Sequence, residues 1–137
     1  MEELTSHDEN GTWRPAVLPD GRKALTARWV FKLKYDGEGS VNRFKARLVA
    51  RGFQQKEGID YEETFSPAVK SDSYRVLFAI AAARGWDVHQ YDFKTAFLNG
   101  DLLQSLFMKA PDGVPVPKGH VLRLIKTLYG LKQAPRA

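Results

Sequence analysis

The chain of 137 residues contains no cysteine, and only two methionines and three histidines. Without cysteine there is no disulfide framework, no thiolate zinc site and no cysteine nucleophile. Long hydrophobic runs are also missing, because the longest uncharged apolar stretch covers residues 76–83, well short of the roughly 18 residues that a membrane span needs. The start, MEELTSHDEN, is acidic and polar, unlike a secretory signal. We therefore expect neither a membrane span nor secretion, and a reducing intracellular compartment is compatible.

What the chain does contain is typical of a globular protein. Hydrophobic residues make up 43%, aromatic residues 12% and charged residues 27% of the sequence. This balance excludes disordered and fibrous classes, and the length suits one domain with its own core.

The charge of the chain is unevenly distributed. Lysine and arginine number 21 against 16 acidic residues, a net charge of +5. Between residues 22 and 56 there are ten basic residues and two acidic ones, and the stretch from residue 118 onward adds five basic residues and no acid. Basic blocks of this kind favour a polyanionic partner.

A β-hairpin is predicted at the centre of the first basic block. In residues 28–35 every second side chain is large and apolar or aromatic, namely Trp29, Phe31, Leu33 and Tyr35. Such strict alternation indicates a half-buried strand. The sequence Asp-Gly-Glu-Gly at 36–39 supplies the glycines of a tight turn. A second alternation follows, with one face formed by Phe44, Ala46, Leu48 and Ala50.

The opposite face of the second strand carries four cations: Arg43, Lys45, Arg47 and Arg51. Side chains two residues apart share a face of a strand, so these charges stack on one side of the hairpin. One interpretation is a solvated face that prevents edge pairing. Because basic residues occupy both strands, we favour a phosphate-binding surface.

Two helices are expected outside the hairpin. One covers residues 2–9 and is stopped by the Asn10-Gly11 pair that follows it. The other covers residues 73–84, with oxygen side chains at 71–73 capping its amino end and Gly85 closing its carboxyl end. Its apolar stripe consists of Val76, Leu77, Ile80 and Ala81.

The remaining pattern predicts short strands and loops. A loop surrounds Pro15, and the connecting segment 52–70 holds one short strand. Residues 86–93 read as a strand that leads to Asp92. Further along the chain we expect a turn at Asn99-Gly100, a strand at 106–109, a loop rich in proline and glycine at 111–119 and a strand at 121–124. The predicted fold class is α+β, with a hairpin, a helix packed on a small antiparallel or mixed sheet, and a ragged carboxyl end.

Asp92, at the end of a predicted strand, is the candidate metal ligand. A lone aspartate of this kind is more often a turn or capping residue, although Mg²⁺ commonly takes one or two carboxylates beside phosphate oxygens. His89 has no second histidine at ligand spacing and is expected to be an ordinary strand residue.

Three blocks of the sequence carry a family resemblance: ARWVFKLKYDGEGSVNRFKARLVARGFQQKEGIDYEETFSPAVK, GWDVHQYDFKTAFLNGDL and LYGLKQAPRA. Together they resemble the reverse transcriptase of copia-type LTR retrotransposons, an RNA-directed DNA polymerase with fingers, palm and thumb. The resemblance implies one truncated domain, with an amino-terminal arm at 1–25, the fingers hairpin and connector at 26–70, and part of the palm at 71–137. It also implies a cytoplasmic location, in a retrotransposon particle.

The resemblance also implies roles for individual residues in nucleotide binding. Arg47 matches the principal arginine that binds the triphosphate of the incoming nucleotide, and Lys45 would assist it. The positions expected to pass close to the triphosphate are Lys94, Thr95 and Ala96. Tyr129 and Gly130 open the block that would pack against the new base pair and the template. Nucleic-acid contacts are expected from Arg43, Arg51 and Lys132.

The palm positions follow in the same way. Asp92 matches the first metal-binding carboxylate, and the backbone carbonyl of Phe93 would be a further ligand. Phe97 matches the bulky residue that excludes a ribose 2′-hydroxyl, whereas its alternative role is core packing.

The family's other two carboxylates belong to a Tyr-x-Asp-Asp hairpin that does not occur in these 137 residues. Two-metal nucleotidyl transfer needs them. Mg²⁺ or Mn²⁺ is therefore expected only in the complete palm, and the chain alone is expected to be inactive.

The partners that the resemblance implies for the chain are an RNA template, a DNA primer, deoxynucleoside triphosphates and the rest of the polyprotein (palm, thumb and RNase H), with no membrane. The alternatives are a non-catalytic nucleic-acid-binding fragment and a remnant without function.

Overall fold

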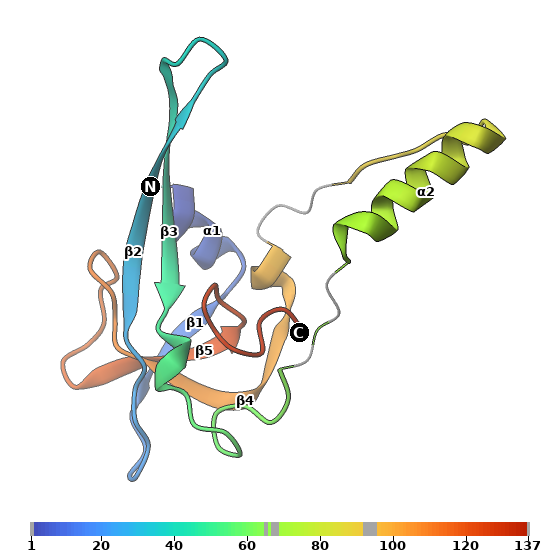
Figure 1. Ribbon diagram of the computed structural model, residues 1–137. Coiled ribbons are helices and arrows are strands. Elements are labelled where there is room, and N and C mark those ends of the chain that lie inside the picture. The colour runs from blue at the N-terminus through green and yellow to red at the C-terminus, as the bar shows by residue number, and fades with distance from the viewer. Residues whose placement is uncertain (1, 65, 67–68, 92–95, 137) are drawn as a thin grey trace.

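The computed structural model describes residues 2–64, 66, 69–91 and 96–136. In these ranges the chain forms a three-stranded antiparallel sheet in the order β1-β5-β4 and a separate β2-β3 hairpin (Figure 1). The elements are α1 (Glu2–Glu9), β1 (Trp13–Val17), β2 (Ala27–Tyr35), β3 (Val41–Ala50), η1 (Gly52–Gln54), α2 (Ser71–Arg84), η2 (Ala96–Asn99), β4 (Asp101–Met108) and β5 (His120–Lys126). The helices and antiparallel sheets confirm the α+β class.

The predicted hairpin and its turn are confirmed. The Asp36 carboxylate accepts hydrogen bonds from the backbone N–H groups of Glu38 and Ser40, at 3.0 and 2.9 Å, and Gly39 has a φ of 85°. The hairpin projects from the body of the protein (Figure 1). Residues 30–44, the distal part of the hairpin, are all exposed, and buried residues occur only at its base. The prediction of a half-buried strand is therefore wrong for the distal part.

The strand β1 was not predicted. The sequence indicates a loop around Pro15, but this residue pairs with Leu122 of β5. Proline is tolerated in β1 because β1 is an edge strand of its sheet. The pairing joins the predicted arm (1–25) to the predicted partial palm (71–137), and the division into these ranges stays a prediction.

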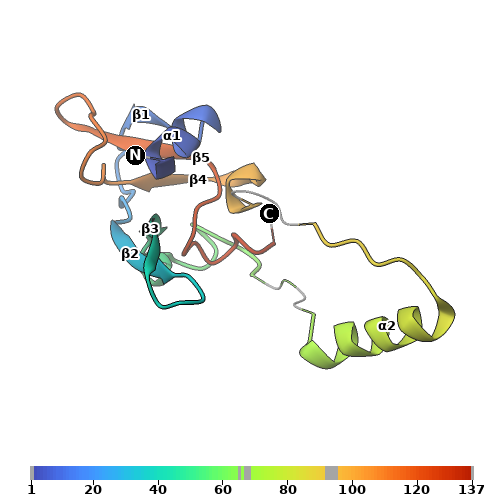
Figure 2. The same ribbon diagram turned by 90° about the horizontal axis from the view of Figure 1, so that it is seen from above.

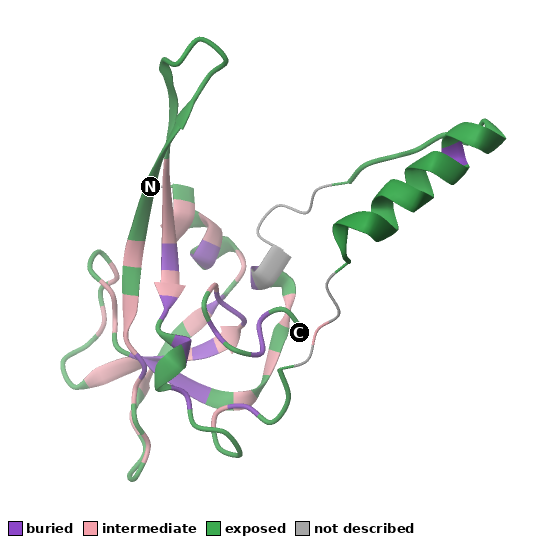
Figure 3. Cartoon of the chain, viewed as in Figure 1, coloured by how far each residue is buried: buried purple, intermediate pink, exposed green. Residues whose placement is uncertain are grey.

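The core lies between the three-stranded sheet, the base of the hairpin and the segment that follows β5 (Figure 3). Its most deeply buried side chains are Leu48, Leu106, Met108, Leu122, Leu124 and Leu128. Leu131 and Ala134 are buried as well, and the N–H of Thr127 donates to the carbonyl of Gly100 at 2.8 Å. The segment after β5 is thus packed into the core as far as Ala134, and the ragged carboxyl end stays a prediction.

The helix α2 is confirmed, but its surroundings differ from the prediction. Gly85 closes it in the left-handed conformation with a φ of 64°, as expected, whereas Lys70 is the residue at the amino cap and no side chain caps the helix. The helix stands away from both sheets (Figures 1 and 2). Leu77 and Ile80 of its apolar stripe are 55% and 41% exposed. The prediction of a helix packed on the sheet is therefore wrong, because the apolar side chains of the sheet pack on the segment after β5 instead.

The predicted strand at 86–93 is also wrong for the part that the structure describes. Residues 86–91 form no strand, and Trp86 and Tyr91 are 53% and 82% exposed. A strand needs a neighbouring backbone with which to exchange hydrogen bonds, and no described strand pairs with this segment.

The other predicted elements have mixed outcomes. Within the described residues of 52–70, the expected strand is reduced to an isolated bridge between Glu57 and Tyr61. The strand expected at 106–109 begins at Asp101, and the one expected at 121–124 extends at both ends. Across the described ranges, no helix combines the length and the apolar character that a membrane crossing requires.

Candidate nucleotide and nucleic-acid interface

Two blocks that are distant in the sequence meet at the base of the hairpin. The guanidinium of Arg47 on β3 lies over the ring of Tyr129, 5.1 Å from its centroid. The backbone N–H of Ala50 donates to the carbonyl of Tyr129 at 2.7 Å. The structure thus brings together two residues that the resemblance places at the incoming nucleotide, Arg47 at the triphosphate and Tyr129 at the base pair.

Glycine is required where the two blocks touch. Gly130 has a φ of 88°, and a Cβ atom on it would lie 2.2 Å from the carbonyl oxygen of Ala50. On the other side, a Cβ atom on Gly52 would lie 2.0 Å from the carbonyl oxygen of Gly130. Both distances are far shorter than a van der Waals contact. Backbone packing therefore requires glycine at position 130, whether or not Gly130 also contacts a ligand.

The cations Arg43, Lys45 and Arg47 share one face of β3, as predicted, whereas Arg51 follows the end of the strand. The strand register pairs Lys32 with Lys45 and Lys34 with Arg43. The pKa of Lys45 is lowered from its ordinary value, first by the neighbouring charge of Arg47, then by burial and by the charges of Lys34 and Arg43. Crowded cations of this kind are stabilised when an anion binds between them.

Two acids of α1 reach the hairpin, and sequence reasoning missed both. Glu2 forms an ion pair with Arg43, one of the predicted nucleic-acid contacts. Oε1 of Glu3 accepts a 3.0 Å hydrogen bond from the backbone N–H of Leu48. The charge of Glu3 also raises the pKa of Lys45, against the neighbouring cations. No local signal in the sequence indicates these contacts, because more than forty residues separate the partners in each case.

His7 is a buried titratable group close to this interface. Its Nδ1 lies 3.1 Å from Oγ1 of Thr12, and its ring stacks on Trp13 with 4.5 Å between centroids. Nε2 has no hydrogen-bond partner, and Oε1 of Glu3 lies 3.8 Å from it. Burial lowers the pKa of His7 to about 4, although the charge of Asp8 acts in the opposite direction.

Lys132 and Arg51 lie in different surroundings. Nζ of Lys132 donates to the hydroxyl of Tyr61 at 2.9 Å and lies 4.7 Å from the centroid of that ring. Its expected contact with nucleic acid would therefore have to compete with Tyr61. Arg51 is exposed and lines a hollow of about 400 Å³ together with Arg28, Phe53 and Gly130.

The predicted palm positions are mostly outside the described residues. These positions are Asp92, Phe93, Lys94 and Thr95. Ala96 and Phe97 begin the short helix η2, but their side chains lie outside the described part of the chain. The described ranges hold no group of three or more histidine or acidic side chains arranged to bind a metal ion. The carboxylate of Asp92 and the carbonyl of Phe93 are oxygen donors of the kind that Mg²⁺ prefers.

Comparison with known proteins identifies the family of the chain. Residues 10–137 match the family model described as "Reverse transcriptase (RNA-dependent DNA polymerase)". The chain is 50% identical, over 99% of its length, to the retrovirus-related Pol polyprotein from transposon TNT 1-94 of Nicotiana tabacum, and 44% identical, over 98%, to that from transposon RE1 of Arabidopsis thaliana. The Gag-Pol polyprotein of transposon Ty1-H of Saccharomyces cerevisiae is 28% identical over 84% of the chain.

These matches cover only part of each relative. The chain spans 10% of the tobacco polyprotein, 9% of the Arabidopsis one and 6% of the yeast one. No solved structure gives a significant match. The family match nevertheless covers most of the chain, and the chain belongs to the reverse transcriptase family, as a reverse transcriptase domain of copia-type retrotransposons.

Proposed function

We propose that this chain forms the fingers and the first part of the palm of an RNA-directed DNA polymerase, where it binds the incoming deoxynucleoside triphosphate and the template. The observation that supports this most directly is the position of Arg47. Its guanidinium lies on the cationic face of the hairpin and over Tyr129, so one residue links the expected triphosphate contact to the expected base-pair contact.

The charges around Arg47 suit a triphosphate. Lys45 and Arg47 share a face of β3, and the mutual repulsion that lowers the pKa of Lys45 is relieved when phosphate oxygens lie between the two cations. Arginine binds phosphate through paired, planar hydrogen bonds. Stacking on Tyr129 restricts the orientation of Arg47 before the nucleotide arrives.

Catalysis would require more than this chain. Asp92 and the carbonyl of Phe93 would hold a divalent cation, Mg²⁺ or Mn²⁺, near Lys94, Thr95 and Ala96. When bound, a pair of such ions activates the primer 3′-oxygen and neutralises the leaving pyrophosphate. Because two of the three carboxylates belong to the Tyr-x-Asp-Asp motif, we propose that the chain is inactive until the rest of the palm is supplied by the polyprotein.

The distal half of the hairpin favours a second candidate function, non-catalytic binding of nucleic acid. Both faces of this half are exposed, and Lys32, Lys34 and Arg43 continue the row of cations beyond Arg47. In this case the Kd for RNA or DNA should rise steeply with salt, with a log–log slope of about 0.9 per neutralised phosphate on duplex DNA and about 0.7 on single strands. Unchanged binding after alanine replacement of Arg43, Lys45, Arg47 and Arg51 together would exclude this face.

Nucleotide binding tests the leading proposal. The double variant K45A/R47A should bind dTTP about tenfold or more weakly in a fluorescence or calorimetric titration, because a hydrogen bond to a charged group contributes about 1.5–3 kcal/mol. The variant R14A/K118A, which removes the same charge from exposed sites outside the hairpin, is the matched control. Equal affinities of the two variants for dTTP would refute the nucleotide site.

A further inference from the structure

Two buried glutamines join the segment 52–61 to the segment that follows β5. Gln55 and Gln133 are only 6% and 7% exposed. Nε2 of Gln55 donates to Oε1 of Gln133 at 2.9 Å, and Oε1 of Gln55 accepts the backbone N–H of Lys132 at 2.8 Å. Both polar atoms of the Gln55 side chain are thus bonded to the block that carries Tyr129.

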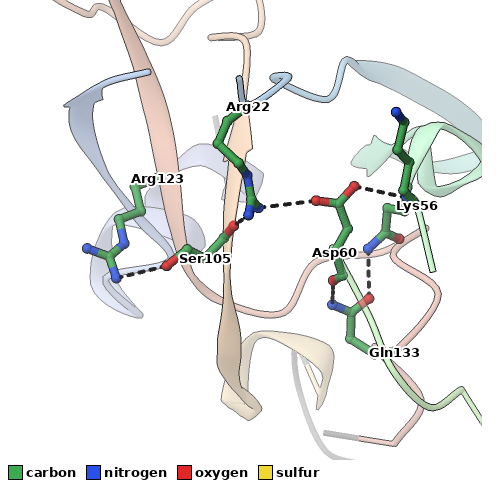
Figure 4. A network of polar contacts seen from close by, with 7 residues as sticks. Arg22, Lys56, Asp60, Ser105, Arg123 and Gln133 are labelled. Carbon is green, nitrogen blue, oxygen red and sulfur yellow. Dashed lines mark hydrogen bonds and ion pairs between the residues drawn. The ribbon is translucent and has the colours of Figure 1, made fainter. Parts of the chain in front are cut away.

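Gln133 is held from its other end as well. Its Nε2 donates to the backbone carbonyl of Asp60 at 3.0 Å. The carboxylate of Asp60 is itself held, by an ion pair with Arg22 at 3.2 Å and by the backbone N–H of Lys56 at 2.9 Å. Figure 4 shows Gln133 and Asp60 within this network. A buried network whose donors and acceptors match favours a single arrangement of its members.

The hydrogen bonds of Gln55 require an amide at this position. Its side chain must donate to Gln133 and accept from Lys132 at the same time. A neutral amide does both, whereas a glutamate has no N–H to donate and a methionine forms neither bond well. The chemistry of residue 55 is therefore matched to the block after β5 and not to solvent.

The block that Gln55 holds also places Tyr129 beside Arg47. The backbone N–H of Ala50 donates to the carbonyl of Tyr129 at 2.7 Å, and Gln55 binds the same block just beyond Gly130. A segment attached at two points keeps the ring of Tyr129 at the guanidinium of Arg47, 5.1 Å from the ring centroid. Such preorganisation reduces the entropy that is lost when a ligand binds.

We infer that Gln55 is a positioning residue for nucleotide binding, because its buried amide keeps Tyr129 where it orients Arg47 toward the triphosphate. Gln55 does not itself contact the nucleotide, since both of its polar atoms are used within the protein. This role rests on the proposed function and adds to it a residue that acts through Tyr129.

The first measurement is the affinity of the 137-residue chain for dTTP. Gln55→Met keeps the length of the side chain and removes the amide, and it should bind dTTP about fivefold more weakly, because the contact between Arg47 and Tyr129 is no longer held in place. Gln54→Met is the matched control. It removes the amide of the neighbouring residue, which binds Thr26 instead of the block after β5, and should bind dTTP as the wild type does.

A double-mutant cycle separates positioning from general stabilisation. In a Tyr129→Ala background, the further change Gln55→Met should leave dTTP affinity unchanged, because Gln55 acts through Tyr129. Losses that simply add would refute the inference. Gln55→Glu is the milder second variant, which keeps the acceptor for Lys132 without the donor to Gln133. It should show an intermediate loss, and it decides the question if Gln55→Met does not fold.

Amide hydrogen exchange provides a readout that is independent of the nucleotide. In Gln55→Met or Gln55→Glu, the N–H of Ala50, which donates to Tyr129, should exchange about tenfold faster relative to the N–H of Thr127, which donates to Gly100. General destabilisation would accelerate both amides alike. That result, or unchanged dTTP affinity in both Gln55 variants, would refute the inference. Failure of the proposed function appears separately, as unchanged dTTP binding in K45A/R47A.

Discussion

The backbone N–H of Leu48 in β3 donates a 3.0 Å hydrogen bond to Oε1 of Glu3 in α1. Leu48 is fully buried at the base of the hairpin, so this bond satisfies a donor that water cannot easily reach. Together with the ion pair between Glu2 and Arg43, it fixes α1 to the strand that carries Lys45 and Arg47.

The variant Glu3→Ala should lower the free energy of unfolding by about 1–3 kcal/mol, because it leaves the N–H of Leu48 without its acceptor. Urea denaturation measures the effect. Glu9→Ala removes the same side chain from the exposed end of α1 and should change stability very little. If both variants are equally stable, the contact between Glu3 and Leu48 does not stabilise the hairpin.

Stability should fall as the pH is lowered from 6.5 to about 4, because burial lowers the pKa of His7 from 6.5 to about 4. Between these values the unfolded chain binds a proton that the folded chain does not, so acid favours unfolding. The stabilisation is complete above pH 6.5, and the total loss is about 3 kcal/mol. Denaturation of the wild type and of His7→Gln at several pH values isolates this contribution, which should be absent from the variant. Parallel pH curves for the two proteins would contradict it.

Gly130→Ala should destabilise the chain far more than Gly58→Ala. Both glycines have positive φ, 88° and 75°, and an alanine in that conformation costs about 1–2 kcal/mol. Only Gly130 would also clash, with Ala50 at 2.2 Å, whereas a Cβ atom on Gly58 meets open space. Equal losses in thermal denaturation would show that the backbone at Gly130 moves aside.

The 137-residue chain should show no primer extension with Mg²⁺ or Mn²⁺, because the proposed metal ligand Asp92 is only one of the three carboxylates that the family resemblance implies for two-metal catalysis. A templated extension assay with a radiolabelled primer tests this. Synthesis that is measurable in the wild type and lost in Asp92→Asn would overturn the prediction.

Phe97 can be tested in a longer chain that includes the Tyr-x-Asp-Asp motif. If Phe97 excludes the 2′-hydroxyl, Phe97→Val should raise kcat/KM for ribonucleotides relative to deoxynucleotides in a protein that still melts cooperatively. If Phe97 is a core residue, Phe97→Ala should cost about 3–5 kcal/mol of stability, and both classes of nucleotide should be affected equally.

The features that the sequence predicts correctly depend on local signals. Alternation and the turn at Asp36 define the hairpin, and Gly85 ends α2. The errors involve partners that are distant in the chain. Pro15 suggests a loop, although it pairs with Leu122 in the sheet. The apolar stripe of α2 does not reveal that Val76, Leu77 and Ile80 stay exposed.

The candidate site shows the same division. The row of cations on the hairpin follows from a period of two, and the roles proposed for Arg47 and Tyr129 come from the family resemblance. The contact between these two residues, and the acids of α1 beside them, depend on tertiary packing. Spacing in the sequence does not contain that information.

The pairing of β1 with β5 sets an order of events during synthesis. Residues 13–17 emerge early, but their partners at 120–124 are made more than a hundred residues later, whereas the β2-β3 hairpin has both strands available almost at once and closes within about 1–10 μs. The cationic hairpin is thus expected to form first. Until residues 120–124 are synthesised, β1 has no partner strand. Such a non-local closure is slow compared with local pairing, so the nascent chain exposes a free strand edge that invites association with other chains.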